Sequence, residues 1–411
     1  MPAVTAAEPI RTLLFSTLYP SAQRPLHGIF VETRLRELLK TGAVQTTVVA
    51  PVPWFPWGDA RWGDYARFAL TPAREVRHGV TVLHPRYLLP PKVGMAPAPL
   101  LLALGALGAV RRLLRDGAGF DLIDAHYYYP DGVAAAMLGH WLGKPVVVTA
   151  RGSDVNLISQ YALPRRQLQW AARQAGASVG VSAALVERMR ALGFDVGRLH
   201  VMRNGVDLQQ FDVLPTAAMR QALGLVGGPL LLSVGNLVAH KGHGLVIEAL
   251  ALLRADPAWS DARLLVVGAG PDAAQFKAQA QALGVAEAVR WVGQVPNADL
   301  KHWYSAADVL VLASSREGWP NVLLEAMACG TPVVASDVGG VREIVQTSPA
   351  GRVVAQRTPA AFAAALTDLL ANPPARTTVR GHAARFGWDS TSQDQLRLFR
   401  HLTSGAPLDM H

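Results

Sequence analysis

Short apolar runs alternate with longer helical stretches along most of the chain. A short apolar run bounded by turn residues is typical of a strand that is buried on both faces of a parallel sheet. In the first half, the predicted strands cover residues 10–16, 46–50, 122–125, 146–149 and 178–181. Because Ala- and Leu-rich helical segments separate these runs, the first half is predicted to be a wound α/β domain.

The same alternation restarts in the second half. Predicted strands cover residues 230–234, 263–267, 309–313 and 332–335, and predicted helices cover 244–253, 271–283 and 320–328. Asn204-Gly205, a turn dipeptide, lies between the two series. We therefore expect an N-terminal domain over residues 1–203, a C-terminal domain over 204–387 and a helical segment over 388–411.

Two segments interrupt the first predicted domain. Residues 51–57 are rich in proline and aromatic residues and are predicted to form a loop. Residues 97–110 are almost wholly apolar and lead into the basic run Arg111–Arg115. This segment is too short to span a bilayer. The sequence leaves two interpretations open: a buried helix, or an interfacial helix with a cationic end.

The composition is that of a folded globular protein, since 50% of the residues are hydrophobic and only 17% are charged. Cys329 is the single cysteine, and its apolar neighbours favour a buried, inert side chain. One cysteine suits a reducing compartment. The sequence predicts neither a secretory signal nor a spanning helix. We expect a cytoplasmic protein, either free or peripheral on the inner face of the cell membrane.

The net charge of +9 is concentrated in the first half. Residues 1–203 contain 23 Lys+Arg and 13 Asp+Glu, a balance of +10, whereas residues 204–411 contain 16 and 17, a balance of −1. A basic first half indicates an anionic partner: a phospholipid surface, a polyprenyl-phosphate carrier or a nucleic acid. The alternative is a solvated face without a partner. No motif that reads nucleic acid accompanies the charge, so nucleic acid is not expected.

Two glutamates eight residues apart, Glu317 and Glu325, give the strongest chemical signal. Glu317 lies in a loop after a predicted strand, and Glu325 lies in the following helix, whose first turn is predicted to begin near Pro320. The unpaired N–H groups at a helix start attract anions, so a sugar diphosphate fits there. The carboxylates would accept hydrogen bonds, Glu325 from ribose hydroxyls and Glu317 from sugar hydroxyls. The alternative is a pair of surface carboxylates.

Further candidate residues follow other predicted strands. The loop Gly235–Gly242 contains Lys241, which supplies a point charge for phosphate, and its glycines allow close approach of the backbone. His126, Arg151 and Asp154 also follow strands of the first domain, where ligands bind in open α/β sheets. For these three, a structural histidine and an internal Arg–Asp pair are the alternatives.

Together these residues resemble the family 4 retaining glycosyltransferases. That family has the GT-B fold: two facing Rossmann-like α/β domains, an interdomain cleft and a C-terminal helix that crosses back to the first domain. The resemblance covers nearly the whole chain, and the Glu317–Glu325 spacing with Lys241 is its most specific part. Within the family, the chain is most similar to bacterial members that build exopolysaccharide or teichuronic-acid-type surface polymers.

The resemblance implies a hexosyltransferase that uses a UDP- or GDP-sugar donor and a glycan or polyprenyl-linked acceptor. His126, Lys241 and Glu317 would act at the reacting sugar and the diphosphate. Catalysis would be electrostatic, with no metal ion and no cofactor beyond the nucleotide-sugar substrate. Other residues would contact the donor: Gly28, Arg151, Asp154, Gly235, Asn236, Gly293, Val295, Asn321, Val322, Leu323 and Glu325.

The chain departs from the family pattern at two positions. Asn236 stands where the family commonly has arginine, and Arg151-Gly152 stands where the family often has His-Gly. Arg203 or Arg151 would then supply the positive charge for the donor phosphate that the family arginine provides.

Three other functions compete with this interpretation. One is a nucleotide-sugar epimerase of related fold, and another is a non-catalytic sugar-nucleotide-binding protein. The third is a dinucleotide oxidoreductase, whose Gly-x-Gly-x-x-Gly fingerprint lacks its final glycine in residues 268–273.

Overall fold

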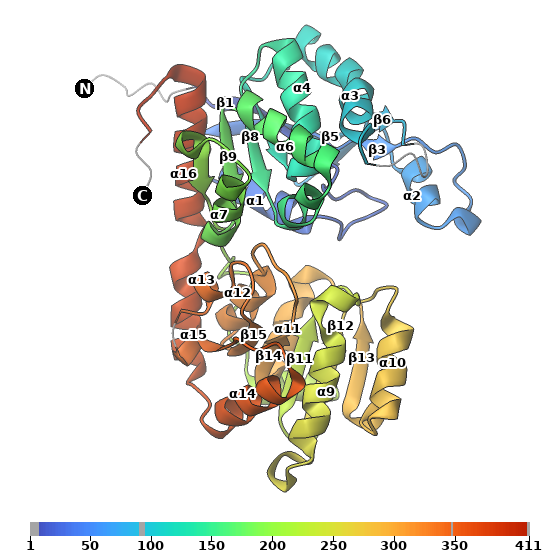
Figure 1. Ribbon diagram of the computed structural model, residues 1–411, viewed down its shortest axis with the longest axis vertical. Helices are drawn as coiled ribbons and strands as arrows, with labels where there is room; N and C mark the ends of the chain where they lie inside the picture. The colour runs from blue at the N-terminus through green and yellow to red at the C-terminus, as the bar shows by residue number, and fades with distance from the viewer. Residues whose placement is uncertain (1–7, 90–94, 347, 409–411) are drawn as a thin grey trace. The chain divides into compact units, whose positions relative to one another are not determined.

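The computed structural model describes residues 8–89, 95–346 and 348–408 (Figure 1). The first seven residues of the N-terminal segment, where no signal peptide is expected, lie outside these ranges. The chain divides into two compact units, one of residues 1–203 with 389–411 and the other of residues 204–388.

The first unit is built around one large sheet. Its strands are β1 (Ile10–Phe15), β2 (Val44–Val49), β4 (Arg74–Arg77), β5 (Val80–Leu83), β7 (Leu122–His126), β8 (Val146–Ala150), β9 (Ala177–Gly180) and β10 (Leu199–Val201). They lie in the order β10-β9-β8-β7-β1-β2-β5-β4, and all pairs are parallel except β4 with β5. From β1 the chain builds outward on one side and then returns to build on the other, so the strand order reverses between β1 and β7.

Helices cover this sheet because its central strands are apolar on both faces. All five residues of β7 and all five of β8 are buried. A small ribbon of β3 (Val52–Pro53) and β6 (Arg86–Tyr87) lies against one of the helices, α3. The helices are α1 (Ile29–Leu39), α2 (Asp64–Leu70), α3 (Ala98–Arg115), α4 (Val133–Leu142), α5 (Ser153–Asn156), α6 (Ala162–Gln174) and α7 (Ala183–Ala191).

The second unit repeats this plan on a smaller scale. Its strands are β11 (Leu230–Val234), β12 (Arg263–Val267), β13 (Val289–Gly293), β14 (Val309–Leu312), β15 (Val333–Ser336) and β16 (Gly351–Val354). They form a fully parallel sheet in the order β13-β12-β11-β14-β15-β16, with the reversal between β11 and β14. This is the strand order of a dinucleotide-binding Rossmann domain.

The helices of the second unit are amphipathic and pack on this sheet. Val246 and Leu250, one turn apart on a helix, are fully buried in the same core as Phe362 and Leu366 of another helix. The helices are α8 (Thr216–Ala222), α9 (His243–Arg254), α10 (Ala273–Ala282), α11 (Leu300–Ala306), α12 (Asn321–Ala328), α13 (Val341–Ile344), α14 (Pro359–Ala371) and α15 (Arg376–Ala383).

The C-terminal helix α16 (Trp388–Ser404) belongs to the first unit from residue 389 onward. Its Leu396 and Phe399 are buried in one core cluster with Leu122 of β7. On the same helix, the Gln395 side-chain amide donates a hydrogen bond of 3.0 Å to Asp124 Oδ2. The helix is therefore joined to the central strands by both apolar and polar contacts.

The predicted architecture of two wound α/β domains with a C-terminal helix is confirmed. The prediction of a loop over residues 51–57 is wrong at Val52 and Pro53, which form β3. The antiparallel pair of β4 and β5 was not predicted, although a two-residue turn joins the strands. Both turn residues, His78 and Gly79, have positive φ, as the tight turns of hairpins require.

The apolar segment 97–110 contributes the first part of α3, with one face buried and another exposed. Leu102 and Val110 are fully buried, whereas Leu100 and Leu104 are 44% and 52% exposed. Within the described residues, no helix has the length and apolar character needed to cross a membrane. Cys329 is buried as predicted, and burial raises the pKa of its thiol to about 12.

Candidate functional site

The candidate residues of the second unit meet at the carboxyl edge of its sheet, where the strand order reverses. Gly235 directly follows β11, and Glu317 follows β14. Gly235 has a φ of +150°. The neighbouring loop also approaches closely, because a side chain at Gly268 would meet the Gly235 carbonyl oxygen at 1.9 Å. In open α/β sheets, ligands bind at such a reversal point.

Lys241 and Glu317 form an ion pair at this edge. The Lys241 Nζ donates to Glu317 Oε1 at 2.8 Å, and the Ser314 hydroxyl donates to the same oxygen at 2.7 Å. The side chains of Lys241 and Glu317 remain 24% and 9% exposed. An ammonium group has three N–H donors, so two of those on Lys241 remain for an anion. The pair thus presents a cation to solvent while a carboxylate fixes its position.

Glu325 is held by two other side chains. The Tyr304 hydroxyl donates to Glu325 Oε2 at 2.8 Å, and the Asn297 amide donates to Oε1 at 3.4 Å. Burial raises the pKa of Glu325, and both hydrogen bonds oppose the rise. Burial and the charge of Glu325 keep the pKa of Tyr304 well above its ordinary value, so the phenol stays a donor. Since a carboxylate has about four acceptor sites, Glu325 can accept further hydroxyl groups.

The first turn of α12 stands between the two glutamates. The helix begins at Asn321 with Pro320 as its N-cap, so the prediction of Pro320 as the first helical residue is off by one. The Asn204 amide donates to the Asn321 side-chain oxygen at 3.2 Å. The Leu323 N–H bonds the Pro320 carbonyl. In the predicted binding mode, the backbone N–H groups of Asn321 and Val322 at this helix start would bind the anion.

The loop with Asn236 is fixed through its backbone rather than through its side chain. His243, the first residue of α9, is buried, with Nε2 3.2 Å from the Asn236 carbonyl oxygen and Nδ1 2.9 Å from the Ser233 hydroxyl. A carbonyl only accepts, so Nε2 carries the proton. Burial lowers the pKa of His243 to about 4. The Asn236 side chain is exposed.

The predicted nucleobase loop reaches the same area through a neighbouring residue. Gly293 ends β13 and accepts a backbone hydrogen bond of 2.8 Å from Gly268. Val295 follows in the same loop. Two residues further, Asn297 makes the hydrogen bond to Glu325. The loop and the glutamate therefore belong to one continuous region of the second unit.

Sequence reasoning missed the side chains that hold these groups in place. Ser314, Tyr304, Asn297 and His243 make the contacts described above. Tyr304 and Asn297 have no local motif to mark them, because they meet Glu325 only through the packing of α11 and its preceding turn on α12. Ser314 and His243 lie within three residues of Glu317 and Lys241, and proximity was the one available signal.

In the first unit, His126 is part of a buried network. The Arg151 guanidinium lies 2.5 Å from His126 Nδ1, and Asp124 Oδ2 lies 3.2 Å from Nε2. A guanidinium only donates, so Nδ1 accepts and the Nε2–H donates to Asp124. Burial lowers the pKa of His126 to about 4, and the Arg151 charge acts in the same direction. The imidazole is therefore neutral at neutral pH, with both nitrogens engaged.

Asp154 has a structural role, and the donor contact that the resemblance implies for it stays a prediction. It is fully buried, and its carboxylate accepts hydrogen bonds from four backbone N–H groups. A substrate hydroxyl would have to displace one of these donors. The Arg151 guanidinium contacts His126 and the ring of Phe30. The four N–H groups belong to Tyr128, Arg151, Gly152 and Val155.

Gly28 precedes α1 with a φ of +66°. A side chain there would meet the Leu18 carbonyl oxygen at 1.9 Å, so only glycine fits against the loop that follows β1. This contact accounts for the glycine within the first unit. The donor contacts that the resemblance implies for Gly28, His126 and Arg151 stay predictions.

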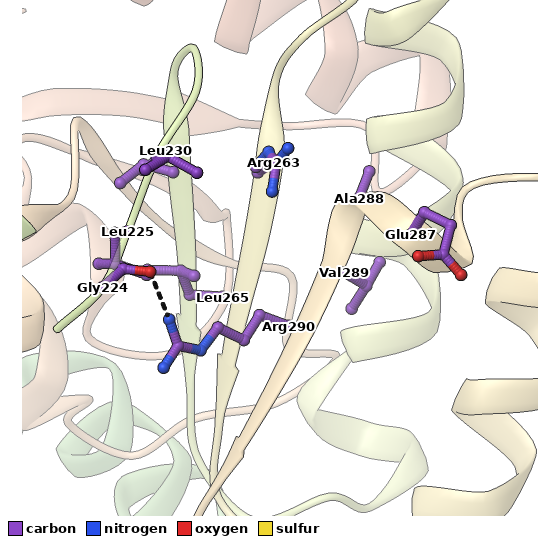
Figure 2. A pocket seen from close by; sticks show the side chains of 10 residues that line it. Gly224, Leu225, Leu230, Arg263, Leu265, Glu287, Ala288, Val289 and Arg290 are labelled. Atoms are coloured by element: carbon purple, nitrogen blue, oxygen red, sulfur yellow. Dashed lines mark hydrogen bonds between the residues drawn. The ribbon is translucent and has the colours of Figure 1, made fainter.

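The opposite, amino edge of the second sheet carries a hollow (Figure 2). Arg290 on its wall donates to the carbonyl oxygens of Leu223 and Gly224 at 2.9 and 3.2 Å, and Arg263 lies at the start of β12. The hollow contains none of the residues predicted to bind a ligand.

Comparison with known families assigns both halves of the chain. Residues 60–210 match the model of Glycosyltransferase Family 4, and residues 216–385 match the model of Glycosyl transferases group 1. The D-inositol 3-phosphate glycosyltransferase of Frankia alni is 36% identical over 310 residues, which are 70% of this chain and 75% of that protein. The putative teichuronic acid biosynthesis glycosyltransferase TuaC of Bacillus subtilis is 32% identical over 343 residues, 82% and 83% of the two chains.

Two solved structures share the fold. Sucrose-phosphate synthase from Thermosynechococcus elongatus has a TM-score of 0.75 at 23% identity, with 97% of this chain and 100% of that chain covered. The Anabaena protein Alr3699/HepE in complex with UDP has a TM-score of 0.71 at 20% identity, with 94% and 98% covered.

Proposed function

The chain belongs to the family 4-type glycosyltransferases of the GT-B fold, and from this premise we propose that it moves a hexose-type sugar from a nucleotide sugar to an acceptor with retention of configuration. The observation that carries the proposal is the arrangement of Lys241, Glu317 and Glu325 at the strand reversal of the second sheet. It combines an accessible cation with two carboxylates that would accept hydroxyl groups.

The donor is proposed to bind with its diphosphate at Lys241 and the start of α12. Lys241 already has one N–H on Glu317, and its remaining donors would contact phosphate oxygens. The first-turn backbone at Asn321 and Val322 would add N–H groups and the positive end of the helix dipole. Glu325 would accept the ribose hydroxyls, and Glu317 would accept a hydroxyl of the sugar.

A UDP- or GDP-sugar is the proposed donor class. The residues from Gly293 to Val295 would lie beside the base, because Asn297 in the same loop contacts Glu325, the proposed ribose ligand. The Anabaena protein of similar fold is described in complexes with UDP and with UDP-glucose, which supports a uridine nucleotide as the first choice.

The proposed transfer is a substitution at the anomeric carbon. The bond from that carbon to the diphosphate oxygen breaks as the bond to the acceptor oxygen forms on the same face. The proton of the acceptor hydroxyl moves to the departing phosphate oxygen. Negative charge grows on the diphosphate during this step, and Lys241 with the α12 backbone would stabilise it. The scheme uses no metal ion.

The proposed acceptor is a lipid-linked or polysaccharide glycan in cell-surface polymer synthesis, inside the cell at the inner face of the membrane. The support is the teichuronic acid relative, together with the balance of +10 over residues 1–203. A basic surface favours an anionic carrier such as a polyprenyl phosphate.

The test measures nucleotide release from a panel of UDP-, GDP- and ADP-sugars, with and without a membrane lipid extract. Glu325→Ala is the site variant, and Glu287→Ala, an exposed glutamate of the same unit, is the control. We expect nucleotide release from one donor, and we expect lipid to stimulate that release. The Glu325→Ala variant should lose the release, and the Glu287→Ala variant should retain it. Conversion of the donor to an isomer without acceptor would show an epimerase. Donor binding without release under all conditions would show a binding protein.

A further inference from the structure

A group of aromatic side chains lies exposed on the first unit, centred on Phe55. The ring of Phe55 is 5.6 Å from the rings of Trp57 and Trp62 and 5.2 Å from that of Tyr65. Trp54, Trp57, Trp62 and Tyr65 are 55%, 56%, 42% and 48% exposed. We name these five residues the aromatic cluster. Large apolar rings held together in water are a feature of interaction sites rather than of ordinary surface.

A second exposed surface runs along α3. Leu100, Leu104 and Gly108 are spaced four residues apart, so they follow one line on the helix, and all three are exposed. Past them, the last turns expose Arg111, Arg112 and Arg115. We name these six residues the α3 stripe. Its first half is apolar or small and its second half is cationic.

The aromatic cluster and the α3 stripe are joined by short contacts. The Trp54 N–H donates 2.7 Å to the Tyr87 carbonyl oxygen beside the β3–β6 ribbon. On the other side, Gly105 of α3 packs so closely on this ribbon that a side chain there would meet Tyr87 Cβ at 2.5 Å. Figure 1 shows α2, β3, β6 and α3 gathered at one side of the first unit. The exposed Leu88 and Leu89 follow β6 directly.

Exposed apolar side chains are concentrated in this part of the molecule. Of the 19 large hydrophobic residues exposed among the described residues, 11 lie within residues 54–104 and three lie in the second unit. The segment 54–115 also contains nine Lys+Arg and three Asp+Glu, a balance of +6. Apolar exposure and positive charge therefore coincide.

We propose that the aromatic cluster and the α3 stripe dock the first unit on an anionic lipid bilayer. Tryptophan and tyrosine rings favour the boundary between headgroups and acyl chains. The leucines of α3 would enter the same depth while its arginines reach the phosphate groups, as in helices that lie in the interface plane. This docking concerns a surface other than the donor site and does not depend on the transferase chemistry.

The same observations disfavour a second copy of this chain as the occupant. Two such surfaces would each carry the +6 balance and would repel each other, whereas anionic lipid is complementary. The tryptophan rings also partly cover each other, because Trp57 and Trp62 stack at 5.3 Å with an angle of 18° between their planes. The stacked, exposed rings form one apolar group, which suits a fluid lipid surface.

The test is co-sedimentation of the full chain, without donor, with vesicles of phosphatidylcholine alone or mixed with phosphatidylglycerol. Trp57→Ser with Trp62→Ser removes two rings of the aromatic cluster. Trp141→Ser, a residue of the same unit that is 40% exposed on α4, is the matched control. We expect binding to the anionic vesicles, a loss of at least about ten-fold in the double variant and no loss in the control.

A second variant separates charge from apolar contact. Arg111→Gln, Arg112→Gln and Arg115→Gln together should abolish the preference for anionic vesicles and the dependence of binding on salt. Equal binding of the wild type to neutral and anionic vesicles, or none to either, would overturn the proposal. A dimer of the wild type in sedimentation velocity without lipid would also overturn the proposal, if the two serine substitutions dissociate that dimer. Nucleotide release is measured separately, so failure here leaves the transferase proposal standing.

Discussion

The two units have the same strand order around their central strands but use charged residues differently at the carboxyl edge. In the second unit, Lys241 and Glu317 remain partly exposed and pair with each other. In the first unit, Asp124, His126 and Asp154 are buried, and protein groups hold them. The same fold position therefore has an accessible ion pair in one unit and a buried hydrogen-bond network in the other. Accessibility separates the two cases, and residue type does not.

The largest effect expected from this comparison is on stability in the first unit. Asp154→Ala removes the acceptor of four buried backbone N–H groups, and each unsatisfied group costs roughly 1–3 kcal/mol. With partial relaxation, we expect a loss of about 4 kcal/mol in the free energy of unfolding. Native-state hydrogen exchange should show lost protection at the Tyr128 and Gly152 amides, while the second unit keeps its protection.

Asp154→Asn is the graded control, since an amide oxygen can still accept some of the four backbone hydrogen bonds. Retention of full protection in Asp154→Ala would contradict the structural role and return Asp154 to the ligand-binding candidates.

The second largest effect is expected on activity in the second unit. Lys241→Ala removes the proposed diphosphate cation and should lower kcat/KM about 100-fold, or about 3 kcal/mol of transition-state stabilisation. The unfolding free energy should change by less than about 1 kcal/mol, because a partly exposed ion pair contributes little to stability. Steady-state nucleotide release and urea unfolding measure the two effects.

Lys277→Ala is the matched control, since Lys277 lies on α10 of the same unit over the ring of Trp291. Equal losses of activity in both lysine variants would argue against a specific role for Lys241.

The contrast between the carboxyl edges of the two sheets explains which features of the fold and the site could be predicted from the sequence. Alternating apolar runs predicted both wound domains, and the Glu317–Glu325 spacing predicted a loop carboxylate followed by a helical one. The full set of hydrogen bonds on Asp154 was not predicted, because one of its four backbone donors, the Tyr128 N–H, lies 26 residues away in sequence. Likewise, the pairing of Lys241 with Glu317 spans 76 residues, so no local pattern could show it.

A smaller effect tests a histidine of the second unit. Burial lowers the pKa of His243 to about 4, so between pH 4 and its ordinary value of 6.5 the unfolded chain binds a proton that the folded chain does not. The stability from neutral His243 is present above pH 6.5 and falls as the pH drops toward 4. From pH 7 to pH 5 this loss is about 2 kcal/mol.

His243→Gln should remove that part of the pH dependence, measured as urea unfolding at the two pH values. His140→Gln, an exposed histidine of the first unit, should keep the wild-type dependence. An unchanged pH dependence in His243→Gln would show that this histidine is not the group that titrates.

The smallest expected effect concerns the support of Glu325. Tyr304→Phe removes the hydroxyl that donates to Glu325 Oε2 at 2.8 Å and leaves the ring in place. The carboxylate then loses one fixed hydrogen-bond donor, which weakens donor binding by about 1 kcal/mol because Glu325 is held less firmly. If Glu325 binds the ribose equally well in the ground and transition states, KM for the donor should rise about five-fold while kcat stays unchanged.

Tyr161→Phe, at a tyrosine that is 56% exposed in the first unit, should change neither constant. A fall in kcat at constant KM would instead place Glu325 at the reacting sugar, and the roles of the two glutamates would then have to be exchanged.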